Sequence, residues 1–190
     1  MKSVCVYLGS NYGARPEYAE AACRLGQVLA ERELTLVYGG SERGLMKELA
    51  DVVMGNGGKV IGVIPEAIRK VAHKGLMELH VVADMHERKA KMAELASAFV
   101  ALPGSFGTLD EFFEMLAWAK LGLHRKPCGL LNICGYYDAL LEFLDHSVIE
   151  EFTHKKHRSM ILTSQSPEDL LDQFSRYQAP QISPWIHQNS

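Results

Sequence analysis

Short apolar runs alternate along this chain with longer segments in which apolar residues recur at helical spacing, and this alternation limits the possible folds. The runs predict strands at residues 4–8, 34–38, 60–64, 79–82, 99–102, 128–133 and 160–163. The segments between them predict helices at residues 16–32, 44–54, 84–98, 108 onward, 136–150 and 167–177. Strands that alternate with helices build a parallel sheet with helices on both faces. We therefore expect an α/β protein with a doubly wound parallel sheet.

The length of 190 residues fits a single domain, which we place at residues 1–178, followed by an irregular tail at 179–190. The formal net charge of -3 gives no indication of nucleic-acid binding. No apolar run is long enough to span a bilayer, and the first strand begins at once, without a signal-peptide pattern. We expect a cytoplasmic protein with no nucleic-acid or membrane partner.

Neither the cysteines nor the histidines form a metal-binding pattern. Cys5, Cys128 and Cys134 lie in or beside apolar runs, which predicts small buried side chains in a reducing compartment. The eight histidines include no HExxH pair. The basic segment at 154–158 predicts a solvated loop. We predict no metal site.

The segment at 103–111, with the sequence PGSFGTLDE, follows an apolar run and opens a helical pattern. A strand, a glycine turn and a helix start leave free backbone N–H groups that bind anions, and phosphate is the usual guest. Glu111 falls in the first turn of the predicted helix, beside that anion site. This arrangement predicts chemistry on a phosphorylated small molecule.

Three loops rich in glycine and serine follow predicted strands, at residues 9–10, 39–41 and 103–107. Ligands of open parallel sheets bind beyond the carboxyl ends of the strands, where these loops lie. The dinucleotide pattern GxGxxG and the triphosphate pattern GxxxxGK[ST] are both absent from the sequence. A monophosphate therefore fits these loops better than a dinucleotide or a triphosphate.

Arg88 and Lys89 stand in the early turns of the helix that Asp84 is predicted to cap. The helix dipole disfavours cations there, and a bound anion would give them a reason to be present. Arg88 also shares a helix face with two methionines, which favours a crevice over open solvent. Two interpretations of Arg88 stay open: an anion site, or a surface ion pair with a carboxylate such as Glu87.

Glu111 also has two interpretations. Thr108 and Glu111 have the spacing of a capping box, with Thr108 as the N-cap, and in that case Glu111 closes the helix start. Alternatively, or in addition, its carboxylate faces the reacting carbon of a phosphorylated ligand.

Three segments together resemble the Lonely Guy (LOG) family of cytokinin riboside 5'-monophosphate phosphoribohydrolases. They are VYGG at 37–40 with GLM at 44–46, MHERKAKM at 85–92, and PGSFGTLDE at 103–111. The similarity continues through residues 121–137 and covers nearly the whole chain. The joint presence of MHxRK and PGxxGTxxE at this spacing is specific to the family, whereas either motif alone is weaker.

The resemblance implies a Rossmann-like fold and a homodimer with active sites at or near the subunit interface. It implies hydrolysis of the N-glycosidic bond of a nucleoside 5'-monophosphate, a cytokinin precursor or AMP, to the free base and ribose 5-phosphate. It implies no cofactor. Similar proteins often carry the label "lysine decarboxylase", but the sequence shows no pyridoxal-phosphate signature.

Carried onto this chain, the resemblance makes Arg88 and Glu111 the catalytic pair. A carboxylate can stabilise the oxocarbenium-like ribose carbon and activate water. Arg88 would orient the substrate and balance charge, because a guanidinium does not release a proton at neutral pH. The phosphate-binding and substrate-binding residues would be Gly39, Gly40, Lys89, Gly104, Ser105, Gly107 and Thr108.

The chain departs from the family pattern at Ser41, Lys70, Ser97, Ser105 and Ala117. Ser105 would be strained if its position requires a positive φ. Lys70 stands where an acidic residue is common, which bears on recognition of the base. These departures keep a second hypothesis open: a non-catalytic nucleotide or cofactor carrier or sensor on the same scaffold.

Overall fold

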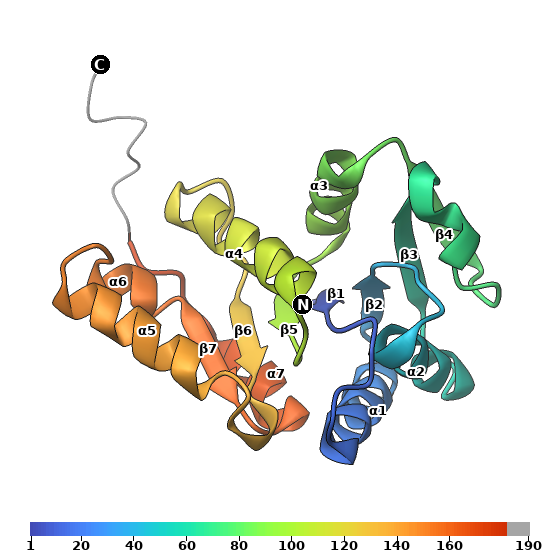
Figure 1. Cartoon of the computed structure of the whole chain (residues 1–190), viewed down its shortest axis with the longest axis horizontal. Coiled ribbons are helices and arrows are strands. Elements are labelled where there is room, and N and C mark those ends of the chain that lie inside the picture. Colours follow the sequence, from blue (N-terminus) through green and yellow to red (C-terminus); the bar gives the residue numbers. More distant parts are fainter. Residues whose placement is uncertain (182–190) are drawn as a thin grey trace.

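Seven parallel strands form one sheet in the computed structural model, which describes residues 1–181 (Figure 1). Their order across the sheet is β4-β3-β2-β1-β5-β6-β7. The strands are β1 Ser3–Tyr7, β2 Thr35–Tyr38, β3 Val60–Pro65, β4 Glu78–Val82, β5 Phe99–Ala101, β6 Cys128–Leu131 and β7 Ile161–Ser164. Every neighbouring pair in this order runs parallel, which confirms the predicted sheet.

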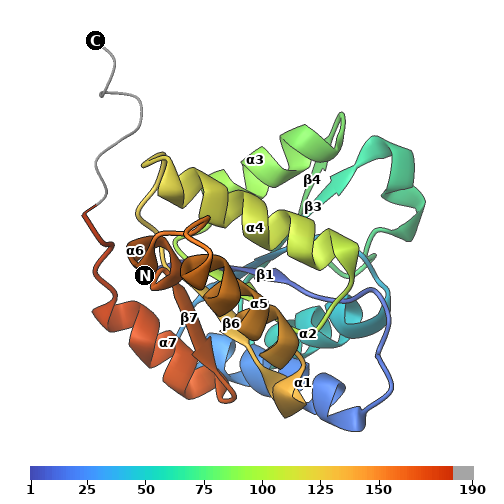
Figure 2. The same cartoon turned by 60° about the vertical axis from the view of Figure 1, so that its left-hand side comes forward.

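Helices cover both faces of the sheet (Figure 2), so the sheet is doubly wound as predicted. Helices α1, α2 and α7 pack into the hydrophobic core on one face, and α3, α4 and α5 pack into the core on the other. The helices are α1 Pro16–Glu31, α2 Gly44–Gly55, α3 Met85–Leu95, α4 Phe106–Lys120, α5 Asp138–Ile149, α6 Lys155–Arg158 and α7 Pro167–Arg176. Two short 3-10 helices are η1 Glu66–Val71 and η2 Ile133–Gly135.

Strand β1 shows why the apolar runs of this sequence are continuous. Val4 and Val6 point into the core with α1 and α2, whereas Cys5 and Tyr7 point into the core with α3 and α4. All four side chains are buried. A strand covered on both faces has no solvent side, and it therefore lacks the polar positions that an exposed sheet face would require.

The chain changes its winding direction between β1 and β5. From β1 it proceeds through β2 and β3 to β4 at the edge, and α3 then brings it back to β5, next to β1. The loops that follow β1 and β5 touch, because Gly9 N donates a hydrogen bond to Pro103 O at 3.2 Å. In doubly wound sheets, ligands bind in the crevice at such a switch point.

Helix α4 begins earlier than the sequence pattern predicted. Its first residue is Phe106 and its N-cap is Ser105, so Thr108 is not the N-cap. The Phe106 side chain is 89% exposed, and the apolar periodicity therefore starts one turn after the helix does. Ser105 has φ -103° and ψ -156°, an extended conformation that any residue adopts, so the expected strain is absent.

Two further segments differ from the prediction. The basic segment at 154–158 is not a loop throughout, because Lys155–Arg158 form α6 with His154 as the N-cap. Cys134 is exposed and not buried, because β6 ends at Leu131 and Cys134 falls in the turn η2 with φ +52°. Cys5 and Cys128 are buried as expected.

The expected irregular tail at 179–190 extends past the described residues. Residues 179–181 have no regular secondary structure, and residues 182–190 lie outside the described part of the chain. Within residues 1–181, no helix combines the length and the apolar character needed to cross a bilayer.

Candidate active site

Arg88 of α3 and Glu111 of α4 form a buried ion pair at the carboxyl edge of the sheet. Arg88 Nη1 donates to Glu111 Oε1 at 2.6 Å, and Arg88 Nε donates to Val63 O at 3.0 Å. Only 7% of Arg88 and 6% of Glu111 are exposed. The surface interpretation of Arg88 is therefore wrong, and its partner is not Glu87, whose carboxylate accepts from Ala83 N.

Glu111 is not a capping residue. Helix α4 starts at Phe106, which places Glu111 in its second turn, past the free N–H groups that a capping glutamate would serve. Its carboxylate is turned to α3 and Arg88 instead. The capping-box interpretation of Thr108 and Glu111 is wrong, and the interpretation in which Glu111 faces a ligand remains.

Burial and charge act in opposite directions on Glu111. Removal from water raises the pKa of its carboxyl group, and the neighbouring Arg88 charge lowers it, with a net shift above the ordinary value of 4.5. A carboxylate with a raised pKa is a stronger base than an exposed glutamate. Glu111 is therefore suited to accept a proton from water.

Gly39 leaves the space that the Arg88 guanidinium occupies. A Cβ at Gly39 would lie 2.1 Å from Arg88 Nη2. Gly40 follows with φ +70°, and a Cβ there would lie 3.3 Å from Val63 N. Gly39 adjoins the Arg88 guanidinium, and neither glycine lines the cavity that opens on the ion pair. Their predicted contact with phosphate stays a prediction.

A cavity of about 140 Å³ opens on the ion pair. It lies at the switch point, between the loops that follow β1 and β5. The sequence-predicted site residues that line it are Arg88, Ser105, Gly107, Thr108 and Glu111. Five of the predicted residues, from α3, from α4 and from the N-cap of α4, therefore meet around one small space.

Consecutive backbone N–H groups at the start of α4 have no acceptor within residues 1–181. This is the case for every amide from Gly104 to Thr108. The loop can fold onto its own helix because a Cβ at Gly104 would lie 2.1 Å from Thr108 Oγ1, and glycine has none. Free amides at a helix N-terminus, beside a cavity, are the arrangement in which proteins commonly bind anions.

Lys89 lies beside this site and links two helices. Its Nζ donates to Asp110 Oδ2 at 3.1 Å and lies 2.8 Å from Glu114 Oε2, a charge contact without hydrogen-bond geometry. The nearby Glu114 carboxylate raises the pKa of Lys89. Lys89 is buried and does not line the cavity. The structure therefore places it between α3 and α4, and its predicted contact with the substrate stays a prediction.

Comparison with known proteins identifies the family. A protein-family model described as "Possible lysine decarboxylase" matches residues 46–174. A cytokinin riboside 5'-monophosphate phosphoribohydrolase of Arabidopsis thaliana is 46% identical over 179 residues, which cover 93% of this chain and 82% of that protein. The enzyme of the same name from Rhodococcoides fascians is 49% identical over 170 residues, covering 88% of this chain and 86% of that protein. The chain belongs to the LOG family.

Solved structures similar to this LOG protein share its fold at low sequence identity. A molybdenum cofactor binding protein from Rippkaea orientalis has a TM-score of 0.71 at 20% identity, covering 93% of this chain and 97% of that chain. A Moco carrier protein from Chlamydomonas reinhardtii has a TM-score of 0.69 at 19% identity, with the same two coverages. At such identities the likeness concerns the fold alone.

The departures from the LOG pattern lie mostly outside the cavity. Ser105 lines it, but Ser97 accepts from Lys2 N at 3.4 Å, at the opposite edge of the sheet. Lys70 is exposed on η1, and Ala117 lines a separate apolar cavity beside α5. Ser41 pairs with Ala72 in an isolated bridge. Of these positions, Ser105 alone touches the space next to the ion pair.

Other residues of the LOG site were not singled out from the sequence. Ser10, Met46, Met85 and Asp110 also line the cavity. Ser10 stands in a glycine-rich loop that the sequence did place at this edge. The methionines stand in two of the segments that carry the family resemblance, but their apolar spacing alone does not separate them from core residues.

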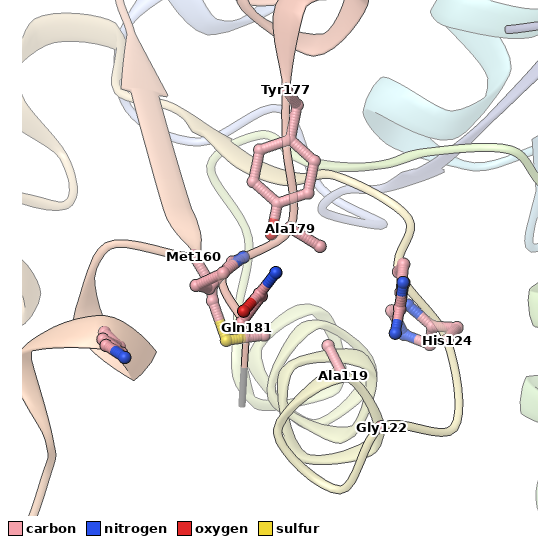
Figure 3. A pocket seen from close by; sticks show the side chains of 10 residues that line it. Ala119, Gly122, His124, Met160, Tyr177, Ala179 and Gln181 are labelled. Carbon is pink, nitrogen blue, oxygen red and sulfur yellow. The ribbon is translucent and has the colours of Figure 1, made fainter. Parts of the chain in front are cut away.

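A larger cavity of about 530 Å³ lies elsewhere on the LOG protein (Figure 3). Its walls include Ala119 at the end of α4, Met160 just before β7, and Tyr177 after α7. These positions belong to the amino edge of the sheet, and none of the predicted site residues lines this larger cavity. Within residues 1–181, no three His, Cys, Asp or Glu side chains gather closely enough to hold a metal ion.

Proposed function

We propose that this LOG protein hydrolyses the N-glycosidic bond of a nucleoside 5'-monophosphate and releases the free base and ribose 5-phosphate. One observation carries the proposal: Glu111 lines the same small cavity as Ser105, Gly107 and Thr108, whose backbone amides are free. A substrate whose phosphate binds those amides presents its ribose to the acid. The names of the relatives from Arabidopsis thaliana and Rhodococcoides fascians support the same reaction.

The reaction breaks the bond between the base and the anomeric carbon of ribose, and water supplies the hydroxyl group that replaces the base. As the base leaves, the anomeric carbon becomes positively charged. The Glu111 carboxylate stabilises this charge and accepts a proton from the attacking water. The proton count balances when the leaving base takes up one proton.

Arg88 keeps the acid in position. Its guanidinium is held by Val63 O on one side and by Glu111 on the other, so it cannot rotate away without losing both contacts. Its charge also favours the ionised carboxylate, because it lowers a carboxyl pKa that burial alone would raise further. We assign Arg88 to orientation and charge balance and not to proton transfer.

The description "Possible lysine decarboxylase" does not fit the chemistry of this site. A lysine that forms a Schiff base needs a lowered pKa. Lys89, which adjoins Arg88 in the sequence, is held between two carboxylates, and its pKa is raised. This lysine is therefore poorly suited to attack a carbonyl carbon.

The working form that we propose is a cytoplasmic homodimer with the active site near the subunit interface. Met85, which lines the cavity, is 44% exposed, and Phe106, at the start of α4, is 89% exposed. Large apolar side chains at the edge of a polar site favour a protein surface that covers them. The free cysteines, two of them buried, fit a reducing compartment.

Product analysis tests the proposal. The purified protein is incubated with AMP or isopentenyladenosine monophosphate, and base, ribose 5-phosphate, nucleoside and inorganic phosphate are quantified. We expect base and ribose 5-phosphate in equal amounts. Tight nucleotide binding without release of base would contradict the proposal and favour a carrier or sensor. The two substrates together show which base the site prefers.

A further inference from the structure

The hydroxyl group of Tyr136 holds the loop that precedes α4. Tyr136 Oη donates to Gly104 O at 2.5 Å. The ring is fixed by edge-to-face contacts with Tyr18 and Tyr137, at centroid distances of 5.7 and 5.0 Å. Because two neighbouring rings restrain it, the Tyr136 hydroxyl has a defined position from which to orient the Gly104 carbonyl.

A peptide group ties the direction of this carbonyl to that of the next amide. The group is planar and trans, so the carbonyl of Gly104 and the N–H of Ser105 point in opposite directions. Gly104 and Tyr136 line a second cavity of about 220 Å³, which does not include Arg88 or Glu111. Ser105 lines both cavities. The hydrogen bond from Tyr136 draws the Gly104 carbonyl toward the second cavity. The Ser105 N–H, at the other end of the same peptide group, therefore points toward the cavity with the ion pair.

We propose that Tyr136 is a positioning residue for the substrate phosphate and acts by aiming the Ser105 N–H into the catalytic cavity. This inference rests on the proposed function, because it takes the free amides of the loop to be the phosphate site. Tyr136 itself does not line that cavity. Its effect on the ligand passes through one peptide group.

Tyr137 provides a matched control on the same loop. Its hydroxyl donates to Leu102 O at 2.6 Å, a contact of the same kind. The next residue is Pro103, which has no N–H, so this hydrogen bond orients no donor toward a ligand. Tyr137 is buried whereas Tyr136 is 45% exposed, and water can replace only the Tyr136 hydroxyl without difficulty. The two hydroxyl groups thus differ in function and in their expected effect on stability.

The test compares Tyr136→Phe and Tyr137→Phe with the unaltered protein. Calorimetry gives the Kd of ribose 5-phosphate and of adenosine, which lacks the phosphate. Steady-state assays with AMP give kcat and KM, and thermal melting gives Tm. In Tyr136→Phe we expect about a tenfold weaker Kd for ribose 5-phosphate and a similar rise in KM, since one aligned hydrogen bond to a charged group is lost. Its kcat, its adenosine Kd and its Tm should stay close to those of the unaltered protein.

In Tyr137→Phe we expect the opposite pattern, a lower Tm with little change in the ribose 5-phosphate Kd. An unchanged ribose 5-phosphate Kd in Tyr136→Phe overturns the inference, and so does an equal loss of adenosine binding. Absence of base release by the unaltered protein counts against the proposed hydrolase and not against this inference, because the Kd readout needs no turnover. If the unaltered protein does not bind ribose 5-phosphate, this inference fails, whereas the proposed hydrolase is judged by base release alone.

Discussion

The Arg88–Glu111 pair is the residue-scale feature on which the proposed chemistry depends. Burying two charges is unfavourable unless they are paired and hydrogen-bonded, and removing one partner leaves an uncompensated charge. Arg88 Nη1 donates a hydrogen bond of 2.6 Å to Glu111 Oε1, and Arg88 Nε donates a second hydrogen bond to Val63 O. A replacement at either position therefore affects stability as well as activity, and melting must be measured beside turnover.

Glu111 should govern the acid limb of the pH–rate profile. Its pKa is raised above 4.5 by burial, so the carboxylate needed for catalysis is lost before an exposed glutamate would protonate. We expect kcat/KM for AMP to fall as the pH is lowered, with an apparent pKa above 4.5. The contribution of Glu111 to the stability of the fold changes with pH in the direction opposite to its contribution to activity. A carboxyl group with a raised folded-state pKa stabilises the fold below pH 4.5, and this contribution is lost as the pH rises through the folded pKa. An acid limb at or below 4.5 would contradict the assignment.

Gly39→Ala should disable the site by displacing the Arg88 guanidinium. The new Cβ would lie 2.1 Å from Arg88 Nη2, and Arg88 is buried between Val63 O and Glu111. We expect a fall in kcat of about tenfold or more, since small displacements of catalytic groups have large effects. Gly55→Ala at the end of α2 is the control, because no atom lies within 4 Å of its new Cβ. Equal kcat values in both variants would show that the guanidinium has room to move.

Helices α3 and α4 are the elements that bring the pair together, and Lys89 joins them. Its contacts with Asp110 and Glu114 cross between the helices, next to the Arg88–Glu111 contact. Two adjacent residues of α3 thus hold α4 by separate ion pairs. Lys89 and Glu114 do not line the cavity, whereas Asp110 does, so this second set of contacts joins the helices at the border of the site.

Lys89→Met should weaken the contact between the two helices and lower kcat. We also expect the free energy of unfolding to fall by about 2 kcal/mol. Lys91→Met is the matched control, because Lys91 pairs with Glu94 on the same helix, and such an exposed pair contributes about 0.3 kcal/mol. Lys89→Arg should restore most of the activity, since a guanidinium can reach both carboxylates. If Lys89→Met and Lys91→Met behave alike, the link between α3 and α4 has no catalytic role.

Most elements of this fold are predictable from the sequence because their apolar patterns are strong. The predicted first residue of α4 was wrong. Phe106 is apolar yet exposed, so the periodicity of buried apolar residues did not include the first turn of the helix. Arg88 and Glu111 were found from the motifs, but their contact was not, because a pairing across 23 positions is set by the packing of two helices. The Tyr136 hydrogen bond to Gly104 is equally non-local and leaves no signal in a single sequence.

At the scale of the whole molecule, the order of the strands places the site. Reversal of the winding direction between β1 and β5 leaves a crevice, and the loops after these two strands form its walls. The larger cavity of about 530 Å³ at the amino edge has no such topological reason to bind substrate. The active site that we propose therefore follows from position in the sheet and not from cavity size.

Light scattering should give a solution mass near twice the 21.2 kDa of the chain. Phe106→Glu should shift the protein toward monomer, because a charge would replace an apolar side chain that is 89% exposed beside the site. Phe143→Glu on α5, at a side chain that is 63% exposed, is the control and should leave the mass unchanged. Dissociation by Phe143→Glu alone would place the interface away from the active site.

The decisive measurement is the rate of base release from AMP by Glu111→Gln, made beside a calorimetric Kd for AMP. An amide keeps the shape of the carboxylate but can neither accept the proton of water nor balance a cationic ribose carbon. We predict that base release falls by at least about a thousandfold while the Kd changes much less. Base release at the rate of the unaltered protein would contradict the role of Glu111 and, with it, the mechanism derived from the ion pair.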